Sequence, residues 1–261
     1  MDIEIGTFDS GGVQLAYGDT GPLAAQPEKG AVLLIHGFAS NMQVNWIGTG
    51  WFDALYEVGY RVIAIDNRGH GKSEKIYDKA QYGAPIMAED ARGLLDHLDL
   101  PHAHVMGYSM GARISAFLAM THPARVRSVV FGGLGINMVR GVGGSDAIAA
   151  ALEAGSVEAV DDENARMFRQ FAERTGGDLV ALATCIRSAR VKIKEEALAA
   201  LDVPVLVTVG TDDGIAGDPQ LLADIIPGAR AFSIPQRDHN RAVGAPPYKT
   251  AVLNFYAEID G

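Results

Sequence analysis

The chain has 261 residues, 48% of them hydrophobic, which is enough for one large core. Its 32 acidic and 22 basic side chains give a formal net charge of −10, which argues against a nucleic acid or an anionic membrane as partner. The single cysteine, Cys185, excludes an internal disulfide and a cluster of thiolate metal ligands.

The sequence carries no recognisable targeting or membrane-spanning pattern. Its first residues, M-D-I-E-I, lack the basic and long apolar regions of a secretory signal. No stretch reaches the roughly 18 apolar residues of a membrane span. We therefore expect a cytoplasmic protein without a membrane partner, and the sequence indicates no particular oligomeric state.

Short β-branched segments alternate with longer helical patterns, which is typical of a mostly parallel sheet covered by helices on both faces. The first two segments, 3–8 and 13–17, flank S-G-G and predict a hairpin. The further predicted strands are 31–35, 61–65, 103–108, 126–131, 205–209 and 230–234. The helices predicted between and after them are 51–58, 86–98, 110–121, 219–226 and 247–259.

One long interval breaks this alternation, between the strands predicted at 126–131 and 205–209. It contains helical patterns at 146–154, 162–174, 179–189 and 194–201. A helical excursion from the carboxyl ends of the strands would lie over a site there as a cap. We therefore expect a core of residues 1–133 and 202–261 with a helical cap of residues 134–201.

The most informative motif is G-Y-S-M-G at residues 107–111, between a predicted strand and a predicted helix. Strand, tight turn and helix form a nucleophile elbow, in which the turn strains the serine backbone and the glycines permit close strand–helix approach. A serine hydroxyl is a poor nucleophile near neutral pH. It needs an imidazole to take its proton and a carboxylate to fix the tautomer of that imidazole. Ser109 is the candidate nucleophile.

Three further motifs accompany the elbow: H-G-F at 36–38, D-N-R-G-H-G-K-S at 66–73, and G-T-D-D at 210–213 with a late His239. With these four motifs in this order, the chain resembles α/β-hydrolase-fold proteins over nearly its whole length except the cap. The resemblance implies the α/β-hydrolase fold: a mostly parallel eight-stranded sheet, helices on both faces and a small helical cap.

The resemblance also implies catalytic roles, because the family places its residues in the order serine, acid, histidine. Ser109, Asp213 and His239 fit that order. Asp213 occupies the acid position of the family pattern G-x-x-D, but Asp212 and Asp218 lie in the same predicted loop, and Asp212 remains the alternative.

Two backbone amides would form the oxyanion hole in proteins of this kind: that of Met110, after the nucleophile, and that of Phe38, after H-G. His36 resembles a structural histidine of the family. For His70 we expect a hydrogen bond that holds two loops together.

The substrate pocket is less clearly marked. Met138, Phe168 and Phe171 in the cap are candidates for an apolar lining, and Phe168 and Phe171 share one helix face. The alternative is that these residues pack the cap onto the core. We expect Cys185 to be a buried packing residue.

The sequence favours a serine hydrolase that cleaves carboxylic esters of small apolar substrates through an acyl-enzyme, with no cofactor or metal. A C–C bond hydrolase, an enol-lactone hydrolase or a cofactor-free perhydrolase- or haloperoxidase-like enzyme would use the same triad. Outside enzymes, the alternative is a ligand-binding, receptor-type member with a vestigial triad. A serine at the nucleophile position disfavours the haloalkane dehalogenases and epoxide hydrolases of this family, which use aspartate there.

Overall fold

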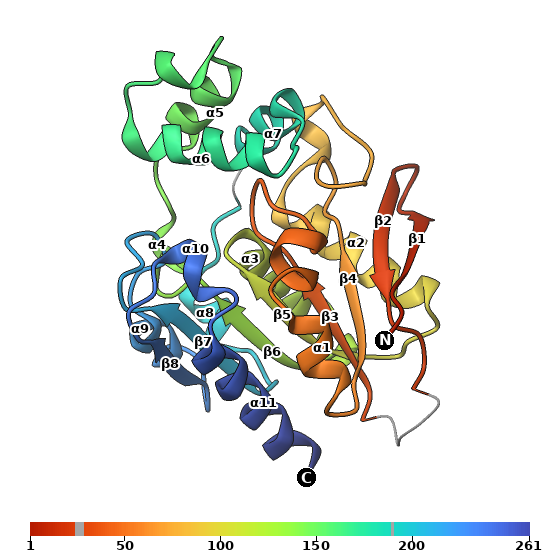
Figure 1. Cartoon of the computed structure of the whole chain (residues 1–261). Coiled ribbons are helices and arrows are strands. Elements are labelled where there is room, and N and C mark those ends of the chain that lie inside the picture. Colours follow the sequence, from red (N-terminus) through yellow and green to blue (C-terminus); the bar gives the residue numbers. More distant parts are fainter. Residues whose placement is uncertain (24–28, 189–190) are drawn as a thin grey trace.

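The computed structural model describes residues 1–23, 29–188 and 191–261, which form an eight-stranded sheet with helices on both faces (Figure 1). The strand order is β1-β2-β4-β3-β5-β6-β7-β8. Strand β2 is antiparallel to both of its neighbours, β1 and β4, and the six strands from β4 to β8 in this order are parallel to one another. The strands are β1 (Glu4–Asp9), β2 (Gln14–Asp19), β3 (Ala31–Ile35), β4 (Arg61–Ile65), β5 (Ala103–Tyr108), β6 (Val126–Gly132), β7 (Val205–Gly210) and β8 (Arg230–Ile234). The predicted mostly parallel sheet is confirmed, with strand ends within one or two residues of those expected.

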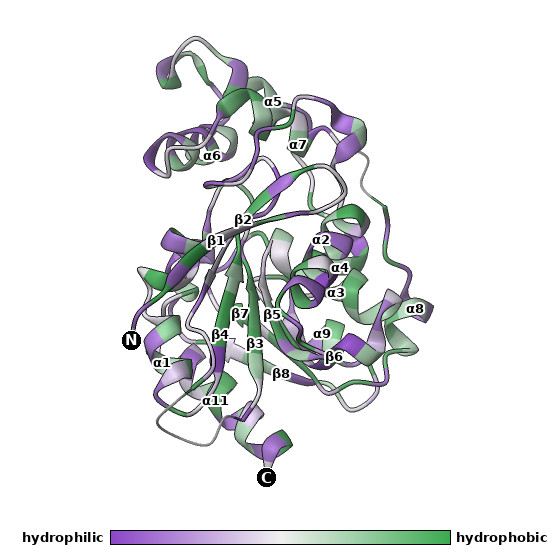
Figure 2. Ribbon diagram, turned by 90° about the vertical axis from the view of Figure 1, so that its right-hand side faces the viewer, coloured by the Kyte–Doolittle hydropathy of each residue, from purple (hydrophilic) through white to green (hydrophobic). Residues whose placement is uncertain are grey.

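Alternate residues of each central strand enter different cores, because successive side chains of a strand point to opposite faces. In β3, Leu33 and Ile35 belong to one apolar core, while Val32 and Leu34 belong to the other. The first core lies under α2 (Ala84–His97), α3 (Met110–Thr121) and α9 (Pro219–Ala223), and the second under α1 (Trp51–Tyr56) and α11 (Pro246–Asp260). Figure 2 shows the apolar colour along β3 and β4 at the centre of the molecule. Burial on both faces explains why these strands are almost continuously aliphatic.

The loops that carry the sequence motifs leave the same edge of the sheet. Ile35, the last residue of β3, pairs with Gly107 of β5, and Tyr108 pairs with Gly132 at the end of β6. Gly132 in turn pairs with Thr208 of β7. Since these strands are parallel and in register, their carboxyl ends meet along one edge, where ligands bind in open α/β sheets.

The interval between β6 and β7 is helical, as predicted. Its helices are α4 (Asn137–Arg140), α5 (Ser145–Glu153), α6 (Glu163–Arg174), α7 (Leu179–Ile186) and α8 (Glu195–Ala199). Asp162 and Asp178 begin α6 and α7 by accepting hydrogen bonds from the amides of Ala165 and Ala181 at 2.7 and 2.9 Å. The helix predicted at 179–189 ends three residues earlier, and its last residue lies outside the described part of the chain.

Helices α5, α6 and α7 pack together above the carboxyl edge of the sheet, whereas α8 contacts α3 (Figure 1). The division of the chain into a core and a cap at residues 134 and 201 stays a prediction.

The remaining short helices are α10 (His239–Ala242), a π-helical turn at Gln43–Ile47 and 3-10 turns at Lys79–Gln81, Pro123–Arg125 and Val157–Ala159. Within the described residues, no helix is long and apolar enough to span a bilayer.

Candidate active site

Ser109 occupies a strained turn between β5 and α3, with φ of +56° and ψ of −111°. The strain is possible because the neighbouring glycines let the backbone come very close. A Cβ atom at Gly107 would lie 2.1 Å from the carbonyl oxygen of Gly111, and one at Gly111 would lie 1.9 Å from that of Ile35. The predicted nucleophile elbow is therefore present, and it holds Ser109 at the carboxyl edge of the sheet.

His239 and Asp213 form a continuous hydrogen-bond line to Ser109. Nε2 of His239 lies 3.0 Å from Oγ of Ser109, and Nδ1 lies 2.7 Å from Oδ2 of Asp213. Because a carboxylate can only accept, Nδ1 carries the proton and Nε2 accepts from the serine hydroxyl. The Asp213 side chain is 0% exposed and that of His239 is 13% exposed, so water screens these contacts weakly.

The structure separates the three carboxylates of the loop after β7. Oδ1 of Asp213 accepts the amides of Ile215 and Ala216 at 2.8 and 3.0 Å, which leaves Oδ2 directed at His239. Asp212 is exposed and accepts the Thr211 hydroxyl at 3.0 Å, as a turn residue does. Asp218, the third carboxylate of this loop, caps α9. Asp238, in the loop after β8, caps α10.

Tyr108 is a functional candidate that the sequence reasoning missed, although it lies within the G-Y-S-M-G motif. Its hydroxyl donates to the backbone carbonyl of His239 at 2.6 Å, and its ring packs 5.5 Å from the imidazole. Burial raises the pKa of Tyr108 well above the usual value of 10, so the phenol remains protonated and able to donate. The residue before Ser109 thus helps to hold His239 in place.

The two predicted oxyanion donors belong to segments that adjoin Ser109. The amide of Met110 is at the first position of α3, where the helix dipole favours negative charge. Gly37 packs against the elbow, since a Cβ atom there would lie 3.2 Å from the carbonyl oxygen of Tyr108 and 3.4 Å from Cβ of Ser109. Among the residues that the structure describes, the amides of Phe38 and Met110 have no hydrogen-bond partner.

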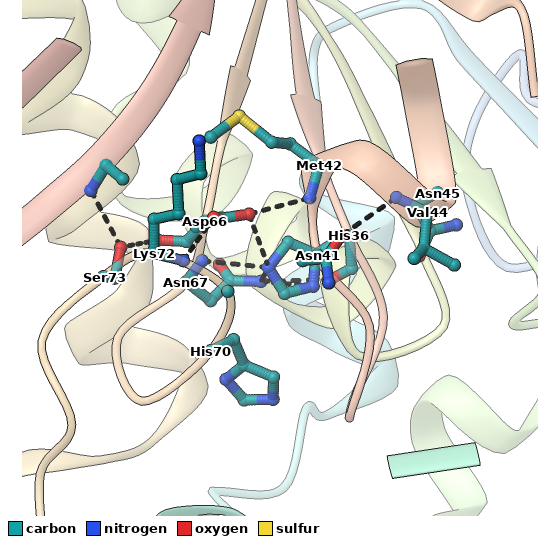
Figure 3. Close-up of polar contacts among 12 residues, drawn as sticks. His36, Asn41, Met42, Val44, Asn45, Asp66, Asn67, His70, Lys72 and Ser73 are labelled. Atoms are coloured by element: carbon teal, nitrogen blue, oxygen red, sulfur yellow. Dashed lines mark hydrogen bonds and ion pairs between the residues drawn. The ribbon is translucent and has the colours of Figure 1, made fainter. Parts of the chain in front are cut away.

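A buried polar network fixes the loop that carries Phe38 (Figure 3). The carboxylate of Asp66 accepts the amides of Met42 and Lys72 at 2.7 and 2.8 Å, which ties the loop after β3 to the loop after β4. Nε2 of His36 accepts the amide of Asn67 at 3.0 Å, and its Nδ1 donates to the carbonyl of the next residue at 2.8 Å. Burial lowers the pKa of His36 to about 4, so the ring is neutral and can both donate and accept.

His70 differs from its expected role as a hydrogen-bonded link between two loops. Its Nδ1 donates to the carbonyl of Arg68, within its own turn, at 3.0 Å. Its contacts with the other loop are between rings, at 5.3 Å from His36 and 5.8 Å from Phe38. Burial lowers the pKa of His70 to about 3, because a charged ring there would be desolvated and close to His36.

Two cavities meet at Ser109, and they share four lining residues: Phe38, Ser109, Phe168 and Ile215. The first, about 180 Å³, is lined by His239 and is called the His239 cavity. The second, about 130 Å³, is lined by Met110 and is called the Met110 cavity.

The predicted lining residues divide between cavity and core. Phe168 of α6 lies between the two cavities, and Phe171 lines the His239 cavity. Met138 is 0% exposed, belongs to the first apolar core and is not among the lining residues of either cavity. Met138 is therefore a packing residue in this structure. Cys185 is buried, as expected, and lines the Met110 cavity.

The end of α6 contacts the candidate oxyanion loop directly. Thr175, at the end of α6, donates its hydroxyl to the carbonyl of Ala39 at 2.7 Å. Ala39 has a φ of +58°, a conformation that a residue with a side chain rarely adopts without support. Helix α6 therefore both lines the cavities and braces the residue that follows Phe38. Within the described part of the chain, no group of three His, Cys, Asp or Glu side chains is placed to hold a metal.

Comparisons with known proteins agree with the fold described above. Residues 30–139 match the sequence profile of the alpha/beta hydrolase fold family. A putative 2-succinyl-6-hydroxy-2,4-cyclohexadiene-1-carboxylate synthase of Bacillus subtilis is 34% identical over 121 residues, which cover 46% of this chain and 41% of that protein. The match thus spans less than half of the relative.

Solved structures are similar over nearly the whole chain. A hydrolase from Pseudomonas aeruginosa has a TM-score of 0.78 at 24% identity and covers 96% of this chain and 97% of its own. The enol-lactonase of Burkholderia xenovorans has a TM-score of 0.76 at 20% identity, over 97% of this chain and 100% of its own. At these identities the similarity establishes the fold.

Proposed function

We propose that this chain, which has the α/β-hydrolase fold, is a serine hydrolase that cleaves carboxylic esters of small apolar substrates through an acyl-enzyme. The observation that carries the proposal is the hydrogen-bond line from Asp213 through His239 to Ser109, with Nε2 placed 3.0 Å from Oγ. In this arrangement a neutral imidazole can take the serine proton while a buried carboxylate fixes its tautomer.

The reaction follows from these positions. His239 removes the proton of Ser109 as Oγ attacks the ester carbonyl, and the carbonyl oxygen becomes an oxyanion. The free amides of Phe38 and Met110 stabilise that charge, because preorganised donors need no reorientation as the charge develops. When the tetrahedral intermediate collapses, the C–O bond breaks and His239 gives its proton to the departing alcohol.

Hydrolysis of the acyl-enzyme repeats the same steps with water. His239 takes a proton from the water molecule as its oxygen attacks the acyl carbon, and returns that proton to Oγ as the carboxylic acid leaves. Asp213 stabilises the imidazolium in both halves of the reaction. The buried side chain of Asp213 supports this role, since its negative charge is desolvated and directed at Nδ1.

Labelling and mutation test the proposal. A fluorophosphonate should modify Ser109 and abolish the hydrolysis of p-nitrophenyl acetate, since only an activated serine reacts rapidly. Ser109→Ala should lose at least about a thousandfold in kcat with its thermal melt unchanged. Ser233→Ala, an exposed position on β8, is the matched control and should behave as the unmodified protein.

The outcome that removes the proposal is turnover by purified Ser109→Ala at the rate of the unmodified protein. Absence of both labelling and turnover would instead favour a ligand-binding member with a vestigial triad. A panel of p-nitrophenyl esters, lactones and vinylogous diketones separates ester hydrolysis from enol-lactone and C–C bond hydrolysis. These reactions use the same triad and differ in the carbonyl substrate.

A further inference from the structure

The two cavities at Ser109 differ in the catalytic group that each contains. The His239 cavity is lined by the histidine that would exchange protons, whereas the Met110 cavity is lined by the first residue of α3. Phe168 and Phe38 line both cavities, and their rings lie 6.1 Å apart. An ester bound at Ser109 therefore has one cavity for its acyl part and another for its alcohol part.

The chemistry of acyl transfer indicates which cavity takes the acyl part of the ester and which takes the alcohol part. In the tetrahedral intermediate the central carbon carries Oγ of Ser109, the oxyanion, the acyl chain and the leaving oxygen. The leaving oxygen must lie within hydrogen-bond reach of His239, because that imidazole supplies its proton. The leaving alcohol then occupies the His239 cavity, and the acyl chain extends to the opposite side.

Building on the serine hydrolase proposed above, we propose that the Met110 cavity binds the acyl chain of the substrate and selects apolar chains of about five or six carbons. Its walls include the side chains of Met87, Leu134 and Ile148, each 3% exposed. They come from α2, from the loop after β6 and from α5, so core and cap both contribute.

The size of the Met110 cavity sets the length of the chain. Its volume is about 130 Å³, and a dry apolar cavity of roughly 150 Å³ is large enough to bind benzene. A pentanoyl or hexanoyl chain, or a benzoyl ring, matches this space. Arg113 also lines it, but its Nη2 donates to the carbonyl of Asn137 at 3.1 Å, which directs the guanidinium toward the protein backbone.

The His239 cavity differs in the side chains that line it. Its volume is about 180 Å³, and Asn45, Thr49 and Asn240 are among its lining residues, together with Val243. Polar side chains at these positions suit an alcohol that carries a further hydroxyl or carbonyl group. The two cavities together therefore suit an ester of a short apolar acid with a polar alcohol.

An acyl-chain series with a constant leaving group tests the assignment. Across p-nitrophenyl esters from acetate to dodecanoate, kcat/KM should rise by up to about fourfold per methylene until five or six carbons, because a buried methylene contributes about 0.8 kcal/mol. It should fall by tenfold or more at ten to twelve carbons. Ile148→Phe should move the optimum to two or three carbons, and Ile148→Ala should move it to longer chains.

A variant of the other cavity is the matched control. Val243→Phe should leave the acyl optimum in place and change the preference among methyl, butyl and benzyl hexanoate. If Val243→Phe moves the acyl optimum and neither Ile148 variant does, the assignment of the cavities is overturned. The use of two Ile148 substitutions keeps the test valid if the larger side chain prevents folding.

Two further measurements complete the test. A preference for the p-nitrophenyl monoester of adipic acid over the hexanoate would overturn the apolar character of the site and implicate Arg113. Fluorophosphonate labelling of Ser109 reports the proposed function independently of chain length. Labelling with a misplaced optimum contradicts the cavity assignment, whereas no labelling and no turnover contradicts the serine hydrolase itself.

Discussion

Replacement of Asp213 by asparagine should reduce kcat by about 10³- to 10⁴-fold, or about 4–5 kcal/mol of activation free energy. The structure dictates which way the new amide would lie. Oδ1 of Asp213 accepts two backbone amides, at 2.8 and 3.0 Å, so that position must remain an oxygen. The NH₂ group would then replace Oδ2, 2.7 Å from Nδ1 of His239.

That orientation forces the wrong tautomer on the imidazole. A donor facing Nδ1 requires an unprotonated Nδ1, so the proton moves to Nε2, which lies 3.0 Å from Oγ of Ser109. A protonated Nε2 cannot take the serine proton, and the imidazolium that forms during the reaction would lack its counter-charge. The fold should persist, because both hydrogen bonds to Oδ1 are retained.

The assay compares Asp213→Asn with Asp212→Asn in the hydrolysis of p-nitrophenyl acetate, with thermal melts to confirm folding. Asp212 is exposed and bonded to Thr211, and an amide can form the same turn, so its change should cost less than threefold. A loss below tenfold in Asp213→Asn would refute the reasoning. A larger loss in Asp212→Asn would transfer the acid role to that residue.

Two further predictions concern the groups around the triad. Tyr108→Phe removes the 2.6 Å hydrogen bond to the carbonyl of His239 and leaves that carbonyl without this donor. The kcat should therefore fall by about five- to a hundredfold, with KM little changed. An unchanged kcat would show that packing alone holds the histidine. Acidification should destabilise the protein between about pH 6.5 and pH 4, because burial lowers the pKa of His36 to about 4 while the unfolded chain takes up the proton near 6.5. At about 1.36 kcal/mol per pKa unit, His36 alone corresponds to about 3 kcal/mol of unfolding free energy, and His70 acts in the same direction. The raised pKa of Asp66 opposes this loss of stability only at the acidic end of the range. Urea denaturation at pH 7, 5.5 and 4.5 measures the net change in the free energy of unfolding. Equal free energies at the three pH values would contradict the prediction.

The hydrophobic pattern of the chain by itself determined the order and type of the elements. Buried strands such as β3 and β4 are almost continuously aliphatic, and the amphipathic helices between the strands leave few alternatives to a parallel sheet. The glycines around Ser109 could also be interpreted locally, since a strained turn with close strand–helix approach excludes side chains at those positions. Elements and elbow were therefore predictable from neighbours in the sequence.

Only the tertiary structure decided which side chains meet. Asp212 and Asp213 are adjacent and chemically identical, and the choice between them depends on two amides and an imidazole 26 residues away. The direction of Met138 into the core depends on how α4 packs, which no local pattern encodes. Local sequence determines much of the backbone conformation, but the orientation of a side chain depends on partners distant in the chain. This is because burial and hydrogen bonding stabilise a contact whatever the separation of its residues in the sequence.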